Sequence, residues 1–497
     1  MTTDFLGARV SLNPRPARQR RAALEVAMLG HSPGRVRVAR LLQLPDLIGE
    51  IRGLGYGRRL DAMARGEADT LAHLPLPLHS VAEFDDIFPE ARRASTRYQS
   101  VLAGDRAWLP WAVEDFFANG GEKLWVIVVP EEEGADGFMP NPGVSPLEVD
   151  NLRGLGLLAI LERVGLFALP DLERLQIPAG LQDIPRKRLR NPTPQFLPCT
   201  VNTDDDHRER RYSEELPVPV APLPLVQLLR RFLPLLEKQR GEAQCLFTLP
   251  LDHSPLLDSP VLHPQEREAL DVAARAVDGY RLRQVQFVFP YLRSAKRKLA
   301  TPVGLLAGLM AESARRRGVW RSVAGLPMIG DGHPYPPLTL ADTLELRQRP
   351  GIGIVQARSG RLMLDDERLT VPALARGDYD SRNIGSPALD GYRSGEVARF
   401  IGYLRRELRE LGESLVFNVG AQDPRPRLVL EKFFTDLHRS GALRGALPEQ
   451  AFTIRQLNAP DSVIAFEIEV APAFPIDRLV LTFVNRDAEW SAEVRGG

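Results

Sequence analysis

Short apolar runs of strand length alternate with segments of helical periodicity along the chain, most clearly in its last third. The runs at 23–29, 124–129, 165–169 and 285–289 each end at a Gly or a Pro, as buried strands often do. This alternation predicts an α/β fold of mixed α+β type, with a mixed sheet flanked by helices as its core. Because 497 residues exceed the size of one ordinary core, we expect roughly two to four compact units.

The last third carries the most complete pattern. Ser394 can cap a helix over 394–411, whose apolar residues recur at spacings of three and four. The apolar positions are Val397, Phe400, Ile401, Leu404, Leu408 and Leu411, and the expected outer face carries Arg399, Arg405, Arg406, Glu407 and Arg409. The other expected elements are strands at 351–357, 415–419, 463–470 and 479–484 and a helix over 426–440 that ends at Gly441.

Changes of composition divide the chain further. Residues 1–22 combine Pro, Arg and small polar residues with the apolar pair Val10 and Leu12, which is typical of an extended arm. Residues 178–225 are Pro-rich with little periodicity, which favours an irregular surface insertion over 178–245, and residues 223–239 within it are expected to be helical. The expected segments are an N-terminal arm (1–22), a first core part (23–177) with an insertion (35–75), the irregular insertion (178–245), a second core part (246–350), a C-terminal unit (351–484) and a C-terminal arm (485–497).

Charge and cysteine content limit the partners. The 64 acidic and 64 basic side chains cancel, so no overall charge attracts nucleic acid or an anionic membrane. Cys199 and Cys245 lack the spacing of a metal site and favour synthesis in a reducing cytoplasm. The first residues lack the apolar segment of a secretory signal, and the most apolar stretch, 154–170, contains Glu162 and Arg163. We therefore expect protein partners, no nucleic acid and no membrane insertion.

One segment has the form of a catalytic motif. Gly30-His31-Ser32-Pro33-Gly34 reads G-x-S-x-G directly after an apolar strand, as in the nucleophile turn of serine hydrolases. Pro33 lacks the backbone N–H that would help to form an oxyanion hole, and only one strand precedes the motif. We favour a plain loop and keep a serine hydrolase that uses Ser32 as the alternative.

The remaining polar clusters do not form a site. His207 follows Asp204, Asp205 and Asp206, and His253 precedes His263, but neither spacing directs several ligands to one point. The Gly-rich segments 49–57 and 351–353 complete no nucleotide-binding pattern. We expect no catalytic residue, no cofactor and no metal.

Three stretches, in order along the chain, carry a family resemblance. The first is Leu109–Val129, with the string Phe116-Phe117-Ala118-Asn119-Gly120-Gly121 between a helix and a strand. The second combines Phe287–Leu292, Pro302-Val303-Gly304, Ala307-Gly308 and Arg317–Gly325. The third spans 415–483 and includes Phe433-Phe434, Gly441-Ala442-Leu443 and Val470-Ala471-Pro472. Together these stretches resemble the tail sheath proteins of contractile injection systems, the family of contractile phage tails, pyocins and related particles.

This resemblance implies a structural subunit that polymerises helically around an inner tube and contracts to drive that tube through a target envelope. It implies terminal arms that add strands to a neighbouring subunit's C-terminal sheet, with Val10, Leu12, Leu479, Leu481 and Phe483 as arm contacts. It also implies outward-facing insertions and an inner-tube contact on one of two helices. The tube-contact candidates are Arg399, Arg405, Arg406 and Arg409 on one helix and Arg427 and Lys432 on the other.

The sequence departs from the family pattern at three places. Val355-Gln356-Ala357-Arg358 matches a family segment in part, Arg455-Gln456 replaces a Cys-Asp pair, and Asn418-Val419 replaces a Glu-Pro pair. These departures leave a baseplate-proximal or minor sheath paralogue as the alternative to the main sheath subunit. The implied partners are copies of the chain or paralogous subunits, the inner tube, and baseplate and terminator or cap proteins. Assembly is expected in the cytoplasm, as part of a phage tail-like particle that is released or membrane-anchored.

Overall fold

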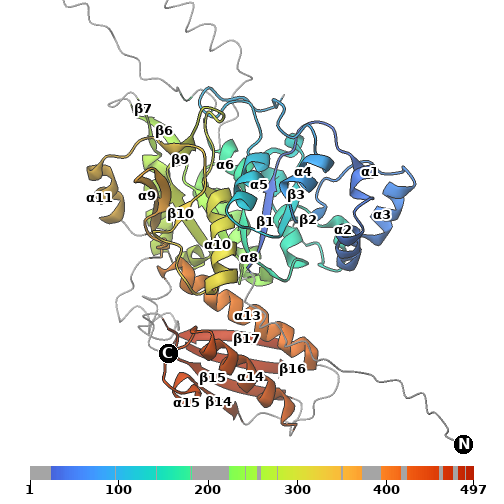
Figure 1. Cartoon of the computed structure of the whole chain (residues 1–497), viewed down its shortest axis with the longest axis vertical. Coiled ribbons are helices and arrows are strands. Elements are labelled where there is room, and N and C mark those ends of the chain that lie inside the picture. The colour runs from blue at the N-terminus through green and yellow to red at the C-terminus, as the bar shows by residue number, and fades with distance from the viewer. Residues whose placement is uncertain are drawn as a thin grey trace, which may run out of the picture.

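A computed structural model describes most of the chain. The described residues are 24–95, 97–141, 143–178, 181, 223–240, 242–254, 259–276, 278–348, 351–371, 393–415, 423–457, 463–473, 479–486 and 489–496. They form a larger body built on one sheet and a smaller C-terminal unit built on another (Figure 1).

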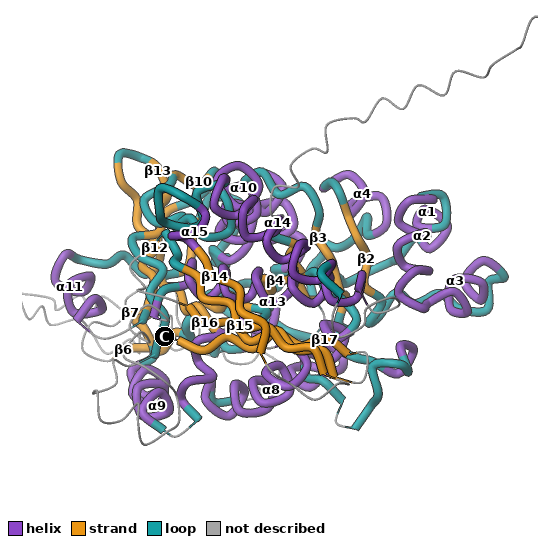
Figure 2. The backbone as a smooth tube through the Cα atoms, turned by 90° about the horizontal axis from the view of Figure 1, so that it is seen from below, coloured by secondary structure: helices purple, strands orange, loops and turns teal. Residues whose placement is uncertain are grey.

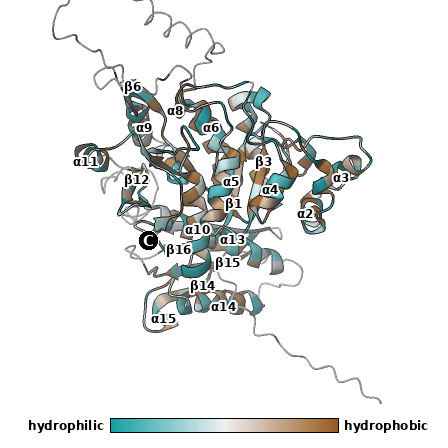
Figure 3. Cartoon of the chain, turned by 45° about the horizontal axis from the view of Figure 1, so that its top comes forward, coloured by the Kyte–Doolittle hydropathy of each residue, from teal (hydrophilic) through white to brown (hydrophobic). Residues whose placement is uncertain are grey.

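A nine-stranded sheet forms the core of the larger body. Its order is β10-β13-β12-β8-β5-β4-β1-β3-β2, and the six strands from β12 to β3 run parallel. The parallel strands are nearly all apolar and buried, and the outer faces of the surrounding helices are more hydrophilic (Figure 3). The bounds are β1 (Glu25–Gly30), β2 (Pro75–Leu78), β3 (Leu124–Val128), β4 (Val164–Ala168), β5 (Gln244–Thr248), β8 (Val285–Phe289), β10 (Pro327–Met328), β12 (Ile352–Arg358) and β13 (Arg361–Leu364).

Helices cover both faces of this sheet. In Figure 2, α10 lies on one side of the sheet, and α8 and α9 lie on the other. The helices are α1 (Val38–Leu41), α2 (Pro45–Ile51), η1 (Arg52–Tyr56), α3 (Gly57–Ala64), α4 (Val81–Ile87), α5 (Leu109–Ala118), η2 (Glu131–Phe138), η3 (Val149–Asn151), η4 (Gly154–Ala159), α6 (Pro170–Leu175), α8 (Leu225–Arg240), α9 (Pro264–Arg275), η5 (Gly279–Gln284), α10 (Val303–Arg317) and α11 (Leu340–Gln348). Two small ribbons, β6 (Leu251–Ser254) with β7 (Ser259–Leu262) and β9 (Tyr291–Arg293) with β11 (His333–Tyr335), complete the body.

Two glycines allow α5 and α10 to pack with their backbones in contact. A Cβ atom on Gly304 would lie 2.6 Å from the carbonyl oxygen of Ala112, and one on Gly308 would lie 2.3 Å from that of Phe116. Real Cβ atoms do not approach an oxygen so closely, so only glycine fits at these positions. The Pro-x-Gly and Ala-Gly motifs of the sequence therefore have a packing role.

The turn after α5 behaves as the sequence predicts. Gly120 has φ +89°, a left-handed conformation that glycine adopts without strain. A Cβ atom on Gly121 would lie 2.2 Å from the Phe116 ring, so the chain reverses directly against the helix that it leaves. The Asn119 side chain bonds both the N–H and the carbonyl of Ile329 at 2.8 Å, which ties the turn to the strand region after α10.

The C-terminal unit is a four-stranded antiparallel sheet in the order β14-β15-β16-β17, with three helices. Its elements are α13 (Gly395–Leu415), α14 (Arg425–Arg439), α15 (Pro448–Ala451), β14 (Phe452–Leu457), β15 (Val463–Val470), β16 (Leu479–Arg486) and β17 (Glu489–Gly496). Helix α13 contacts β17 on one side and β4, β5 and η5 of the larger body on the other, so it joins the two parts. The expected helix ended by Gly441 is confirmed, with φ +76° at that glycine.

Four expectations about boundaries are wrong. Strands β12 and β13, placed at the start of the C-terminal unit, belong to the nine-stranded sheet because β12 pairs with β8. The boundary of the irregular insertion at 245 lies too late, because the helix expected at 223–239 is present as α8 and strand β5 begins at Gln244. The expected C-terminal arm contains β17, which pairs with β16 of the same chain. Leu415 ends helix α13 instead of starting a strand, and residues 416–419 lie outside the described part of the chain.

Among the described helices, none combines the length and the apolar character that crossing a membrane requires.

Candidate functional site

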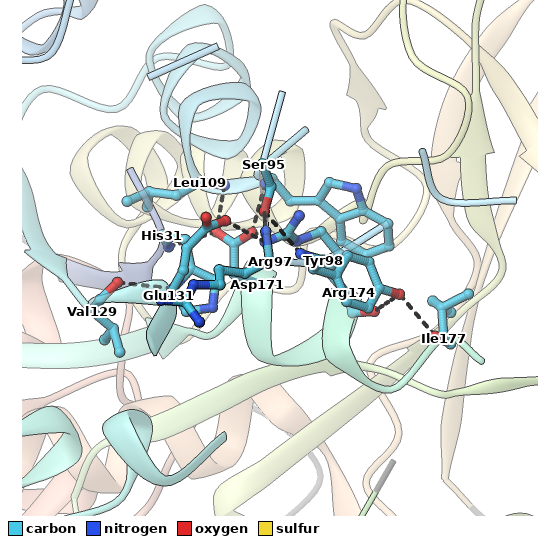
Figure 4. Close-up of polar contacts among 11 residues, drawn as sticks. His31, Ser95, Arg97, Tyr98, Leu109, Val129, Glu131, Asp171, Arg174 and Ile177 are labelled. Atoms are coloured by element: carbon cyan, nitrogen blue, oxygen red, sulfur yellow. Dashed lines mark hydrogen bonds and ion pairs between the residues drawn. The ribbon is translucent and has the colours of Figure 1, made fainter. Parts of the chain in front are cut away.

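The carboxyl end of β1 is the first place to look for a ligand site. In the sheet, β1 has β3 and β2 on one side, which follow it first in the chain, and β4 and β5 on the other side, which follow later. In open α/β sheets, ligands bind where strand connections diverge in this way. His31 follows β1, Glu131 follows β3 and Asp171 follows β4, so all three lie at this edge (Figure 4).

Asp171 is fully engaged with neighbouring backbone groups. Its carboxylate accepts hydrogen bonds from the backbone N–H groups of His31 (2.8 Å), Trp108 (2.8 Å) and Leu109 (2.9 Å). The last two groups lie at the start of α5, whose first N–H groups have no partner inside the helix. The Asp171 carboxylate caps the first turn of α5 and is stabilised there by the positive end of the helix dipole. Asp171 therefore fastens α5 to the end of β1.

Arg174 completes a buried ionic network with Asp171. Its Nε lies 2.9 Å from Asp171, its Nη2 lies 3.2 Å from Glu131, and its guanidinium stacks 4.7 Å from the centre of the Tyr98 ring. The Tyr98 hydroxyl lies within hydrogen-bond distance of the carbonyl oxygens of Arg174 and Ile177. Burial raises the pKa of Tyr98 to about 12.

This network fills the crevice in which an α/β protein would bind a ligand. Asp171 and Arg174 are completely buried, and their charges are directed at each other and at backbone groups. The arrangement therefore holds together the loops that follow β1, β3 and β4. Sequence analysis missed it; the available signal was the Pro-Asp pair that directly follows strand β4.

Ser32 lacks the neighbours that would activate a nucleophile. Its hydroxyl makes no hydrogen bond to the described residues. The adjacent His31 ring lies edge-on against Phe138, with its Nδ1 2.8 Å from the carbonyl oxygen of Val129, and burial lowers its pKa. An activated serine needs a base within hydrogen-bond reach, so the geometry favours a plain loop here.

Glu173 is the most strongly perturbed acid of the same edge. It lies two residues after Asp171 in α6, close to the hydroxyls of Thr248 and Thr301, and is completely buried. Desolvation raises its pKa to about 8, so the carboxyl group is largely protonated at neutral pH. Its side chain has no solvent-exposed surface among the described residues, so its surroundings are part of the core.

The sequence candidates for a metal do not come together. Within the described ranges, no three His, Cys, Asp or Glu side chains surround one point. His263 caps α9 by accepting a hydrogen bond from the N–H of Glu266, and Cys245 is buried with a free thiol. His207 and Cys199 lie outside the described residues.

A surface cleft of about 670 Å³ lies between η2, η3 and α8. Four of its charged side chains form two ion pairs: Asp136 with Arg231 at 2.7 Å, and Glu133 with Arg153 at 3.7 Å. Glu133 also lies 2.8 Å from the buried ring of His73. These pairs neutralise the charges that a small ligand would otherwise recognise.

The expected arm contacts divide into two groups. Val10 and Leu12 lie outside the described residues. Leu479, Leu481 and Phe483 belong to β16, an interior strand paired on both sides by β15 and β17, and the last two side chains are buried. Within one chain these three residues therefore belong to an interior strand, and their contact with a neighbouring subunit stays a prediction. The edge strands of this sheet are β14 and β17, and each pairs with one strand among those described, β14 with β15 and β17 with β16.

The expected outer face of α13 is wrong for two of its arginines. Arg399 is 2% exposed and forms a 2.8 Å ion pair with the buried Glu367. Arg406 is also buried and donates to the carbonyl oxygen of Glu242 at 3.1 Å. Arg409 forms a 2.7 Å ion pair with the same Glu242, and Arg405 is half-buried. The arginines of α13 thus bind the larger body, and no periodicity in the sequence distinguishes such a face from a solvated one.

The second candidate helix remains accessible. On α14, Arg427 is exposed and pairs with Glu431 one turn along the helix, and Lys432 is exposed. Leu428, 58% exposed, lies between them. This helix therefore presents a mixed basic and apolar face.

Comparison with known proteins identifies the fold. No family model matches the chain, and no curated protein matches it. A chain of the anti-feeding prophage baseplate, a cryo-EM structure, has a TM-score of 0.50 and 14% identity, over 96% of this chain and 97% of that one. The anti-feeding prophage helical sheath in the contracted state has a TM-score of 0.49 and 14% identity, over 96% and 98%. The PVC sheath complex of an extracellular contractile injection system, also in the contracted state, has a TM-score of 0.47 and 13% identity, over 81% of this chain and 84% of that one.

We base the fold assignment on the baseplate chain, with which the likeness extends over nearly the full length of both proteins. The mixed α/β fold expected from the sequence is confirmed, and the chain shares its fold with a component of the anti-feeding prophage particle.

Proposed function

We propose that this chain is a structural sheath subunit of a contractile injection particle, without a catalytic role. The observation that carries the proposal is the likeness of fold to a chain of the anti-feeding prophage baseplate over almost the whole length of both. The buried network at the carboxyl end of β1 supports it, because the usual ligand crevice of an α/β sheet is filled by Asp171 and Arg174. A subunit of this kind works through contacts with its neighbours, and repeated contacts that do not close on themselves generate a helical filament.

The edge strand β14 supports strand addition between subunits. Thr453, Arg455 and Gln456 on this strand are exposed, and an unpaired strand edge offers backbone groups to an extended peptide. The proposed donor is the arm at residues 1–22 of a neighbouring copy, with Val10 and Leu12 as its apolar contacts. Backbone hydrogen bonds of this type permit a change of filament pitch without dissociation.

The proposed inner-tube surface is the exposed face of α14, with Arg427, Leu428 and Lys432. Lys432 supplies a positive charge that suits an acidic surface on the tube, Arg427 is paired with Glu431, and Leu428 supplies apolar contact. The arginines of α13 are less suited because Arg399 and Arg406 are buried against the larger body.

A baseplate-proximal or minor sheath paralogue is the second candidate. One observation favours it: the solved chain with a TM-score of 0.50 belongs to a baseplate structure. The departures from the family pattern at 355–358, 418–419 and 455–456 agree with a specialised copy. In either role the proposed partners are further copies or paralogues, the inner tube, and baseplate and terminator or cap proteins, assembled in the cytoplasm.

Electron microscopy of the chain co-expressed with its tube and baseplate genes tests the proposal. Striated helical sheaths in narrow long and wide short forms are expected for the main subunit. A single ring next to the baseplate would instead identify the minor paralogue. Dispersed monomers under these conditions would refute both.

Deleting residues 1–20 tests the arm. We expect the truncated chain to remain folded by circular dichroism and to form no filaments. The matched control is an Ala replacement of exposed Val272 on α9, which should leave filament length unchanged. Filaments of normal length from the truncated chain would refute the arm contact.

A further inference from the structure

The larger body ends in two helical projections of opposite character. Figures 1 and 2 both show α11 at one extreme and the α1–α3 lobe at the other. Helix α11 contacts the body mainly through β12, and the lobe is anchored by α2 against β2. The two projections therefore face away from each other and lie free for contact with other molecules.

Helix α11 is exposed on two opposite sides, one apolar and one acidic. Leu340 is 76% exposed and Leu344 is 49% exposed, and their spacing of four residues places them on one side of the helix. Asp342 accepts hydrogen bonds from the N–H and hydroxyl of Thr339, and no described cation lies within ion-pair distance of Asp342 or Glu345. Arg347, the one basic residue of this helix, is already paired with Asp365 at 2.9 Å.

The α1–α3 lobe carries the opposite charge. Arg35, Arg37, Arg40 and Arg58 are exposed, and no described carboxylate lies within ion-pair distance of any of them. The other exposed arginines of the lobe are neutralised, because Arg52 pairs with Asp61 and Arg65 with Glu67. A chain whose net charge is zero thus separates an acidic projection from a basic one.

We propose that α11 of one copy docks on the basic α1–α3 lobe of the next copy in the assembled particle. The occupant is a second copy because the two surfaces are complementary in charge and belong to the same chain. Their positions at opposite extremes make the contact head-to-tail, so it repeats without closing between two molecules. This inference rests on the proposed role as a polymerising subunit.

Substitutions that reverse the charge of one projection at a time give a direct test. The first variant combines Asp342→Asn with Glu345→Arg, which keeps an acceptor for Thr339 and makes both projections basic. The second variant combines Arg37→Glu, Arg40→Glu and Arg58→Glu, which makes both projections acidic. We expect each variant alone to be folded and to need a concentration roughly tenfold or more above wild type for polymerisation, because several attractions become repulsions.

Mixing the two variants in equal amounts should restore polymers. The altered α11 of the first variant then faces the altered lobe of the second, and the unaltered surfaces are also opposite in charge. Light scattering and electron microscopy at low and high salt would measure the effect, which should weaken as salt screens the charges. The matched control is Glu268→Arg with Arg275→Glu on α9, two exposed charges outside both projections, and it should polymerise like wild type.

The outcomes separate this proposal from the proposed function. If wild type forms no polymer under any condition, the sheath role fails. If wild type polymerises and both variants polymerise equally well alone, the sheath role stands and the α11–lobe contact is refuted. If each variant fails alone and the mixture also fails, complementarity between these two surfaces is refuted.

Discussion

The Arg399 guanidinium lies 2.8 Å from the Glu367 carboxylate, and both side chains are buried where α13 meets the larger body. Glu367 also accepts a hydrogen bond from the N–H of Val323 at 2.9 Å, and Arg399 approaches Gln286 at 3.4 Å. The pair therefore joins the helix that leads into the C-terminal sheet to two segments of the larger body. A residue that sequence analysis assigned to an outer surface thus holds the two parts of the molecule together.

Replacing Arg399 by Met should destabilise the protein by about 3–5 kcal/mol, because it leaves the buried Glu367 charge without its partner. Urea unfolding followed by circular dichroism measures the loss. Adding Glu367→Leu to Arg399→Met should recover much of it. The control is Arg427→Ala, an exposed cation on α14, with an expected change within about 0.5 kcal/mol. Equal effects from Arg399→Met and Arg427→Ala would contradict the burial of this pair.

Gly308→Ala should destabilise the larger body by about 1–3 kcal/mol, because the added methyl would collide with the Phe116 carbonyl oxygen and force α5 and α10 apart. Thermal unfolding measures the change. Gly49→Ala on α2 is the matched control: no atom lies within 4 Å of its added Cβ, so the helix should gain about 0.4–1 kcal/mol. A neutral Gly308→Ala would show that the two helices are not in backbone contact.

The buried Glu173 should make stability fall as pH rises. Its folded-state pKa is raised to about 8 from an ordinary value near 4.5, so between these values the folded chain holds a proton that the unfolded chain releases. Stability therefore decreases with rising pH in this window, by up to about 1.4 kcal/mol per pH unit. Glu173→Gln removes this contribution. Urea unfolding of both proteins from pH 5 to pH 8 should show their stabilities diverging in favour of Glu173→Gln at the higher pH, and parallel curves would disprove the raised pKa.

Ser32 should show no reactivity as a nucleophile. We expect a fluorophosphonate probe to leave the native chain unlabelled, since no base contacts the Ser32 hydroxyl among the described residues. Ser32→Ala should also assemble like wild type. Labelling that disappears in Ser32→Ala would revive the serine hydrolase alternative.

The sequence by itself determined the local structure. The apolar run at 124–129 and the Asn119-Gly120-Gly121 turn predicted a helix, a reversal and a strand, because these depend on neighbouring residues. The periodic apolar positions of 394–411 likewise predicted α13, although it extends to Leu415. The matches in order along the chain also predicted a fold that the chain shares with a component of the anti-feeding prophage particle.

The tertiary structure alone decided which surfaces are free. Arg399 and Arg427 look alike in sequence, yet one is buried against Glu367 and the other lies in solvent, because the partner of Arg399 is 32 positions away and is brought close only by folding. Asp171 similarly gains its role from His31 and Leu109, which are distant in the chain and meet at one edge of the sheet. Strand β16 is interior for the same reason. The apolar pattern of its sequence predicts a strand, but only the folded structure shows that this strand pairs with β17.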